Sequence, residues 1–160
     1  LRLTELRRCL VQHHPALLQE RLTDELGRFG GRRIVGNVRI GIEHASRAEY
    51  DFHLAALVAS GGMVLAGDRL QDLDEVQGAH LGKLLALCAA RTPAARFDDM
   101  GFSSGRVALP GGGELLCLFN WDEQATEMGL PAGGTDFWSE APLGETLVLA
   151  GGQGAVIRYY

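Results

Sequence analysis

Two groups of polar residues directly follow the two apolar runs in the first half of the chain. These residues are Glu43, His44 and Arg47 after the first run, and Asp68 and Arg69 after the second. Carboxylate, imidazole and guanidinium groups can hydrogen-bond a polar ligand, and paired carboxylates can perform acid–base chemistry. Because ligands of α/β folds gather at the carboxyl ends of parallel strands, we expect these five residues to line one rim.

The first apolar run, from Ile34 to Ile42, alternates with a period of two, which predicts a strand. One of its faces carries Asn37, Arg39 and Glu43, which is unusually polar for a strand buried in a parallel sheet. Such a face suits a barrel whose interior opens onto a carbohydrate or another polar ligand. An edge strand with one solvent-exposed face explains the same pattern equally well.

The spacing of Ser46 and Glu49 is that of a capping box, and it predicts a helix that runs to residues 60–62. A second strand is predicted at 63–67, and Asp72 or Asp74 caps a second helix. This order predicts a βαβα unit with parallel strands. Residues 1–29 also show helical spacing from the first residue onward, so we expect the chain to be part of a longer protein.

The character of the sequence changes at residues 91–93, beyond which short β-patterned runs alternate with turns. The runs are 106–109, 114–120, 126–130, 135–138, 145–149 and 155–159. They predict an antiparallel β-sandwich at 93–160 behind an α/β segment at 1–92. The glycines at 111–113 and 151–154 lie between strands, which predicts hairpin turns rather than phosphate-binding loops.

The composition argues against several partners. The net charge of −5 leaves no basic surface for nucleic acid or an anionic membrane. There is no apolar run long enough to span a bilayer and no signal-peptide pattern. Three widely spaced cysteines fit the cytoplasm better than secretion. His44, Glu49 and His53 lack a metal-binding pattern, so we expect neither a metal nor a cofactor.

Five segments occur in an order similar to that in bacterial α-galactosidases of glycoside hydrolase family thirty-six, in clan D. They are Ser46 to Glu49, the Ser60-Gly61-Gly62 run to Leu70, Leu118 to Asp122, Asp136 to Glu140, and Gly154 to Tyr159. The resemblance covers roughly residues 20–160. It implies the last βα units of a (β/α)8 barrel followed by a C-terminal antiparallel β-sandwich.

Such enzymes are retaining glycosidases with a carboxylate nucleophile and a second carboxyl group as acid/base. In the family the nucleophile follows the fourth barrel strand, a part that this chain does not contain. Residues 39–43 mimic the Arg-Ile-Gly-x-Asp sequence of the acid/base, with Glu43 in place of the aspartate. The spacing to Ser60 favours another alignment, in which Asn37 begins the seventh barrel strand. Glu43 is therefore the catalytic candidate by motif alone, and the substrate-binding candidates are Asn37, Arg39, His44, Asp68 and Arg69.

The sequence thus predicts a C-terminal fragment of a retaining glycoside hydrolase that acts on α-linked hexosides in the full-length protein. Alone it should be inactive, and its unpaired strand edges predict a homo-oligomer or association with the missing N-terminal part. The alternative is a non-catalytic carbohydrate-binding or interaction module with Trp121 or Trp138 as a sugar-stacking platform, although such tryptophans more often lie in a core. A third possibility is a small complete enzyme that uses Glu43 and Asp68.

Overall fold

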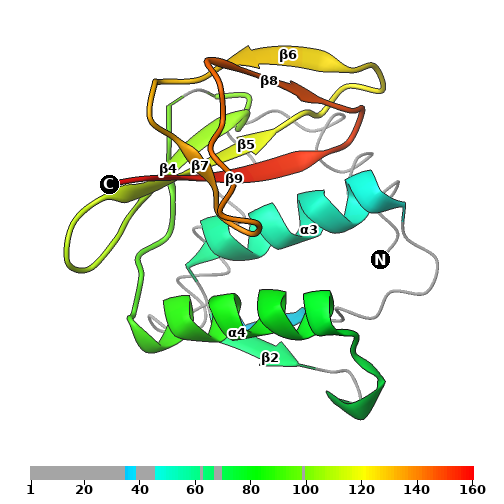
Figure 1. Ribbon diagram of the computed structural model, residues 1–160, viewed down its shortest axis with the longest axis vertical. Coiled ribbons are helices and arrows are strands. Elements are labelled where there is room, and N and C mark those ends of the chain that lie inside the picture. The colour runs from blue at the N-terminus through cyan, green and yellow to red at the C-terminus, as the bar shows by residue number, and fades with distance from the viewer. Residues whose placement is uncertain (1–34, 39–45, 62, 67–69, 99) are drawn as a thin grey trace. The chain divides into compact units, whose positions relative to one another are not determined.

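The computed structural model of the chain describes residues 35–38, 46–61, 63–66, 70–98 and 100–160 (Figure 1). Residues 35–160 form one of two compact units into which the chain divides. The helices expected within residues 1–29 lie outside the described residues.

A parallel strand pair and two helices make up the first half of this unit. Strand β1 (Val35–Val38) pairs with β2 (Met63–Ala66) in parallel, from Val35 opposite Met63 to Val38 opposite Ala66. Helix α3 (Arg47–Ser60) connects them, and helix α4 (Glu75–Ala89) follows β2 after a short 3₁₀ turn, η1 (Leu70–Asp72). The predicted order of strand, helix, strand and helix is confirmed, and so is its parallel pairing.

Local chemistry sets the ends of α3. Ser46 Oγ accepts a hydrogen bond from the Glu49 amide at 3.2 Å, and the Glu49 carboxylate accepts one from the Ser46 amide at 2.9 Å. This capping box satisfies two amides that the first helical turn leaves unpaired. Gly61 ends the helix at a φ of +58°, and a Cβ there would lie 2.4 Å from the Ala94 nitrogen. Only glycine fits that position.

The second half of the unit is antiparallel β-structure. A five-stranded sheet has the order β3-β4-β5-β9-β7, and β6 pairs with β8 as a separate two-stranded ribbon. The bounds are β3 (Arg96–Phe97), β4 (Ser104–Ala108), β5 (Glu114–Phe119), β6 (Thr126–Gly129), β7 (Thr135–Asp136), β8 (Thr146–Leu149) and β9 (Gly154–Tyr159). The predicted antiparallel sheet domain is confirmed.

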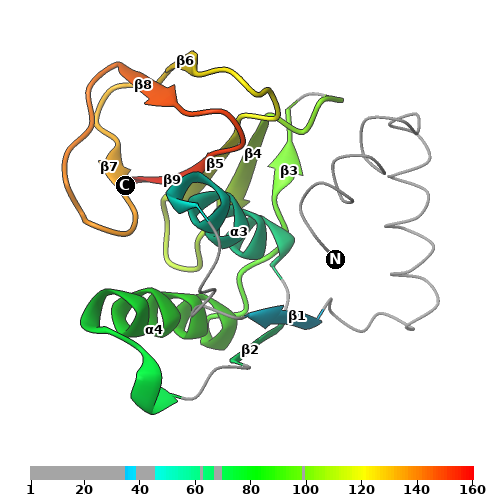
Figure 2. The ribbon, with the colours of Figure 1, turned by 90° about the vertical axis from the view of Figure 1, so that its right-hand side faces the viewer.

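The five-stranded sheet is covered on both faces, by α3 on one side and by the β6–β8 ribbon on the other (Figures 1 and 2). Residues 115–119 of β5 are consequently all buried. The ribbon side holds a core cluster of aliphatic side chains: Leu116, Leu118, Leu130, Leu149 and Ile157. On the helix side, Gly154 of β9 lies so close to α3 that a Cβ there would meet Phe52 Cα and Ala55 Cβ at 2.9 Å.

One expectation about the glycine turns needs correction. The glycine turn at 111–113 joins the paired strands β4 and β5 as predicted, but the turn at 151–154 is not a hairpin. It leads from β8, which pairs with β6, to β9, which pairs with β5 and β7. Strand β3 was also not predicted, because two residues are too short for an alternating pattern. The boundary at residues 92/93 and the parent barrel stay predictions.

Candidate functional site

Most of the predicted ligand-binding rim lies outside the described residues. This holds for Arg39, Glu43, His44, Asp68 and Arg69. Asn37 lies on β1, opposite Leu65 of β2. Because the pairing is parallel and Val38 lies opposite Ala66, the carboxyl ends of the two strands lie side by side at the same end of the pair. The predicted rim is compatible with this register and stays a prediction.

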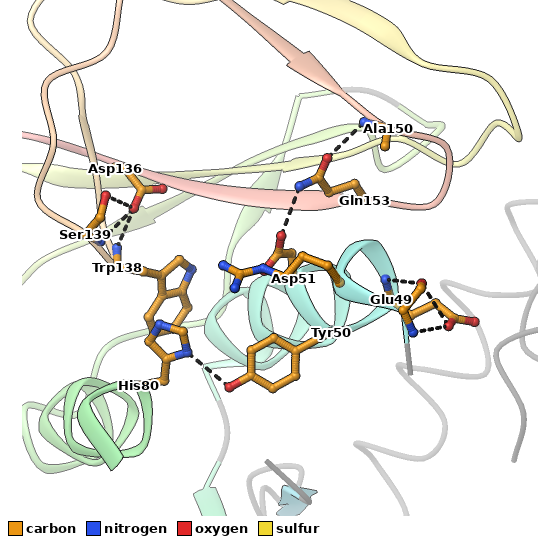
Figure 3. A network of polar contacts seen from close by, with 11 residues as sticks. Glu49, Tyr50, Asp51, His80, Asp136, Trp138, Ser139, Ala150 and Gln153 are labelled. Atoms are coloured by element: carbon orange, nitrogen blue, oxygen red, sulfur yellow. Dashed lines mark hydrogen bonds and ion pairs between the residues drawn. The ribbon is translucent and has the colours of Figure 1, made fainter. Parts of the chain in front are cut away.

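The described residues form a polar network where the two helices meet the sheet domain (Figure 3). One part of it includes His80 of α4, which is 5% exposed. The Tyr50 hydroxyl of α3 lies 3.0 Å from His80 Nδ1, and the indole of Trp138, which follows β7, lies 4.9 Å from the imidazole between ring centroids. We call Tyr50, His80 and Trp138 the histidine joint. It connects three segments that are distant in sequence.

Burial lowers the pKa of His80 below its usual value, because a buried imidazolium loses its hydration. The nearby charges are mixed: Arg47 and Lys83 lower this pKa further, whereas Asp51 and Asp136 raise it. His80 is therefore held neutral at neutral pH. A neutral imidazole offers one nitrogen acceptor and one N–H donor, which suits a hydrogen bond to a tyrosine hydroxyl.

Lys83 fastens α4 to the same segment after β7. Its ammonium donates hydrogen bonds to the carbonyl oxygens of Phe137 at 2.8 Å and Trp138 at 3.0 Å, and it pairs with the Glu140 carboxylate at 2.8 Å. This contact lowers the pKa of the exposed Glu140. The segment itself is shaped by Asp136, whose carboxylate accepts hydrogen bonds from the Trp138 and Ser139 amides.

A second polar bridge starts from Asp51, whose side chain points in a different direction from that of Tyr50 (Figure 3). Asp51 pairs with Arg47 one turn earlier at 2.9 Å and accepts a hydrogen bond from the Gln153 side chain at 2.9 Å. Gln153 in turn accepts one from the Ala150 amide. The β8–β9 turn is thereby attached to the first half of α3.

Both tryptophans take part in packing contacts within the protein. Trp121 donates its indole N–H to the Phe102 carbonyl at 3.0 Å, and its ring lies 4.8 Å from that of Phe52. Trp138 is engaged by His80 and by the Phe137 ring, at 4.9 Å in each case. Both side chains are half-buried. Their surroundings favour the packing role over the stacking role on which the carbohydrate-binding module depended.

An apolar cavity of about 10 Å³ lies between the two helices, lined by Leu57, Leu84 and Thr92 among others. Such a volume is at the lower limit for a single water molecule and excludes a sugar. Within the described ranges, no three His, Cys, Asp or Glu side chains are grouped closely enough to hold a metal ion. None of the described helices is long and apolar enough to cross a membrane.

Sequence reasoning did not single out Tyr50, His80, Lys83 or Gln153. His80 and Lys83 lie one turn apart on α4, which was visible as spacing but not as a function. Tyr50 and His80 are 30 positions apart, and Asp51 and Gln153 are 102 apart. No local sequence pattern predicts contacts between residues so far apart.

No protein-family model and no curated protein sequence matches the chain. Solved structures do. One is a putative α-N-acetylgalactosaminidase from Bacillus halodurans, with a TM-score of 0.60 and 15% identity over 72% of this chain and 31% of that one. Another is α-galactosidase I from Mortierella vinacea, with a TM-score of 0.58 and 13% identity over 76% of this chain and 38% of that one.

A third similar structure is a GH27 β-L-arabinopyranosidase from Geobacillus stearothermophilus, with a TM-score of 0.55 and 15% identity over 72% of this chain and 30% of that one. The likeness is one of fold. The chain spans about a third of the length of these enzymes. About three quarters of the chain thus shares its fold with a part of several glycosidases of the α-galactosidase type.

Proposed function

We propose that the chain is the C-terminal part of a glycoside hydrolase of the α-galactosidase type. The supporting observation is that a parallel βαβα unit and an antiparallel sheet domain share one core, with α3 packed directly on β5 and β9. Glycosidases with TM-scores of 0.58 and 0.60 share this fold over about three quarters of the chain. The parallel unit would be the end of a (β/α)8 barrel, of family GH27 or family thirty-six type.

The proposed substrates of the whole protein are α-linked hexosides. The similar structures include enzymes named for α-galactoside and α-N-acetylgalactosaminide hydrolysis, and a Saccharomyces cerevisiae α-galactosidase was solved with raffinose. In this chain Glu43 is the proposed acid/base. Asn37, Arg39, His44, Asp68 and Arg69 are the proposed sugar-binding residues.

The proposed nucleophile belongs to an earlier part of the protein. Among the described residues, β1 and β2 pair only with each other. A second copy or the preceding barrel strands would pair their outer edges. The proposed location of the whole protein is the cytoplasm.

Hydrolysis of a chromogenic α-galactoside tests the proposal. The 160-residue chain should be inactive, and a longer protein that includes the chain should be active. In the longer protein, Glu43→Gln should lower turnover by about 100-fold or more, since general acid–base catalysis contributes that much. Glu145→Gln, at an exposed carboxylate of the sheet domain, is the matched control and should have no effect.

Two results would contradict the proposal. Turnover by the 160-residue chain alone that disappears in Glu43→Gln would make this chain a complete enzyme. A longer protein that is inactive on every α-linked hexoside tested would remove the glycosidase assignment itself.

A further inference from the structure

The histidine joint brings three segments that are distant in sequence to one imidazole. Tyr50 comes from the first turns of α3, His80 from the middle of α4 and Trp138 from the segment after β7 (Figure 3). His80 is 5% exposed, and its contacts with Tyr50 and Trp138 are 3.0 Å between atoms and 4.9 Å between ring centroids. A change in the charge of this ring therefore acts on all three segments at once.

We propose that the histidine joint is acid-sensitive, so that protonation of His80 loosens the contact between the helix pair and residues 137–140. This inference does not depend on the proposed glycosidase activity. It rests on where the imidazole lies and on which groups face it.

Protonation removes the acceptor that the Tyr50 hydroxyl can use. If Nδ1 carries no proton in the neutral ring, it accepts a hydrogen bond from the Tyr50 hydroxyl. In the imidazolium form Nδ1 carries a proton, so the Tyr50 hydroxyl must rotate and accept the hydrogen bond instead. It also places a full charge on a ring that is almost entirely removed from water, and such a charge is costly unless it is paired.

The charges around the ring do not supply such a pair. Arg47 on α3 and Lys83 on α4 oppose a new positive charge, and Asp51 on α3 and Asp136 on β7 favour it. Asp51 is already bonded to Arg47 and Gln153, and the Asp136 carboxylate to Ser139 and Trp138. The Trp138 ring, 4.9 Å away between centroids, attracts a cation. That attraction is smaller than the hydration that a buried charge loses.

The direction of the effect follows from proton linkage. The pKa of His80 lies below 6.5 when the joint is closed and returns toward 6.5 when the ring reaches water. Between these two values the open form binds more protons than the closed form. The joint is therefore fully stable above about pH 6.5 and is weakened as the pH falls toward the lower pKa.

Lys83 provides a second, non-titrating hold on the same segment. Its bonds to the Phe137 and Trp138 carbonyls persist at acidic pH, because a lysine remains charged there. The expected response is thus a local loosening of residues 137–140 rather than detachment of the sheet domain.

The test combines an NMR titration of the histidine rings with amide hydrogen exchange of residues 137–140. Both are measured on the full 160-residue chain between about pH 7.5 and pH 5, where the carboxylates stay ionised. The His80 midpoint should lie below 6.5. Exchange protection at Trp138 and Ser139, corrected for the intrinsic pH dependence of exchange, should fall on acidification. Uptake of one proton can lower the protection factor by at most about tenfold for each pH unit.

His80→Gln keeps an acceptor for Tyr50 but cannot titrate, so its protection at residues 137–140 should not depend on pH in this range. His53→Gln is the matched control, because burial also lowers the pKa of His53 while its ring is not part of the joint. It should behave like the unmodified protein.

A His80 midpoint at or above 6.5 would overturn the proposal without any variant. So would an equal acid-induced loss of protection in the unmodified protein and in His80→Gln.

Discussion

The side-chain amide of Gln153 donates a hydrogen bond to the Asp51 carboxylate at 2.9 Å, across 102 positions of sequence. Its carbonyl oxygen accepts a hydrogen bond from the Ala150 amide at 2.9 Å. One side chain therefore attaches the β8–β9 turn, which links the two sheets, to the helix that covers the larger sheet. The relationship shows how the antiparallel domain and the βαβα unit are joined.

Gln153→Ala should lower the free energy of unfolding by about 1–2 kcal/mol, because a hydrogen bond to a partly buried carboxylate and one to a backbone amide are lost. Urea denaturation followed by circular dichroism measures the change. Gln124→Ala, at an exposed glutamine of the neighbouring turn, is the control and should change the free energy by less than about 0.5 kcal/mol. Equal losses in the two variants would show that the bridge does not stabilise the fold.

Asn120 is a polar residue buried in the core of the sheet domain. It is 2% exposed, and the two N–H groups of its side chain are shared among three carbonyl oxygens, those of Gln124, Leu149 and Ala150. Asn120→Asp replaces that donor by an oxygen and should lower the free energy of unfolding at pH 7 by about 3 kcal/mol or more.

The Asn120→Asp loss should become smaller as the pH falls toward about 4, the pKa of an aspartate in the unfolded chain, because a protonated carboxyl group can donate one hydrogen bond. Denaturant titrations at neutral and acidic pH, with the unmodified protein as reference, measure this recovery. Asn120→Ala cannot recover in this way and serves as the control. A loss that does not depend on pH in Asn120→Asp would contradict the assigned donor role.

Gly154→Ala should destabilise the protein by about 1–3 kcal/mol. The added Cβ would lie 2.9 Å from Phe52 Cα and Ala55 Cβ, so α3 must move away from β9. Gly129→Ala, on strand β6 where a Cβ meets nothing within 4 Å, should be neutral or slightly stabilising. Thermal unfolding of the two variants separates close helix–sheet contact from a general effect of removing glycine. Similar melting temperatures would argue against that contact.

Cys117 should resist thiol reagents in the folded protein. It is fully buried in β5, and burial raises the pKa of its thiol to about 12, so almost no thiolate is present at pH 8. Mass spectrometry after treatment with iodoacetamide should find the Cys117 peptide unmodified until denaturant is added. The half-buried Cys88 should be modified faster than Cys117 in the folded state. Labelling of both at the same rate would show that β5 opens readily.

The elements predicted best are those whose signals are local. The Ser46–Glu49 spacing and the Gly61 stop lie within one helical turn of the ends they mark, and both ends of α3 were confirmed. The strand predicted at 135–138 is shorter in the structure, because the Asp136 side chain binds the Trp138 and Ser139 amides and ends the pairing. The hairpin predicted at 151–154 was wrong because a glycine turn does not specify which strand pairs with which.

The predicted site, unlike the predicted fold, is largely untested by the structure. The parallel register of β1 and β2 agrees with a rim formed at the carboxyl ends of both strands. Most of the proposed rim residues lie outside the described residues and stay predictions: Arg39, Glu43, His44, Asp68 and Arg69. The histidine joint was not predicted. Its three members are ordinary residues in sequence, and only their convergence distinguishes them.

The sequence by itself determined the βαβα order, the helix ends and the antiparallel character of the second half, because periodicity, capping and turn chemistry act over a few residues. The tertiary structure decided which strands pair, that α3 covers the larger sheet, and that Tyr50, His80 and Trp138 meet. These contacts depend on burying apolar surface between segments far apart in sequence, and many alternative pairings have the same local pattern. The Gln153–Asp51 bond belongs to this second class, since it forms only after the β8–β9 turn and α3 are brought together.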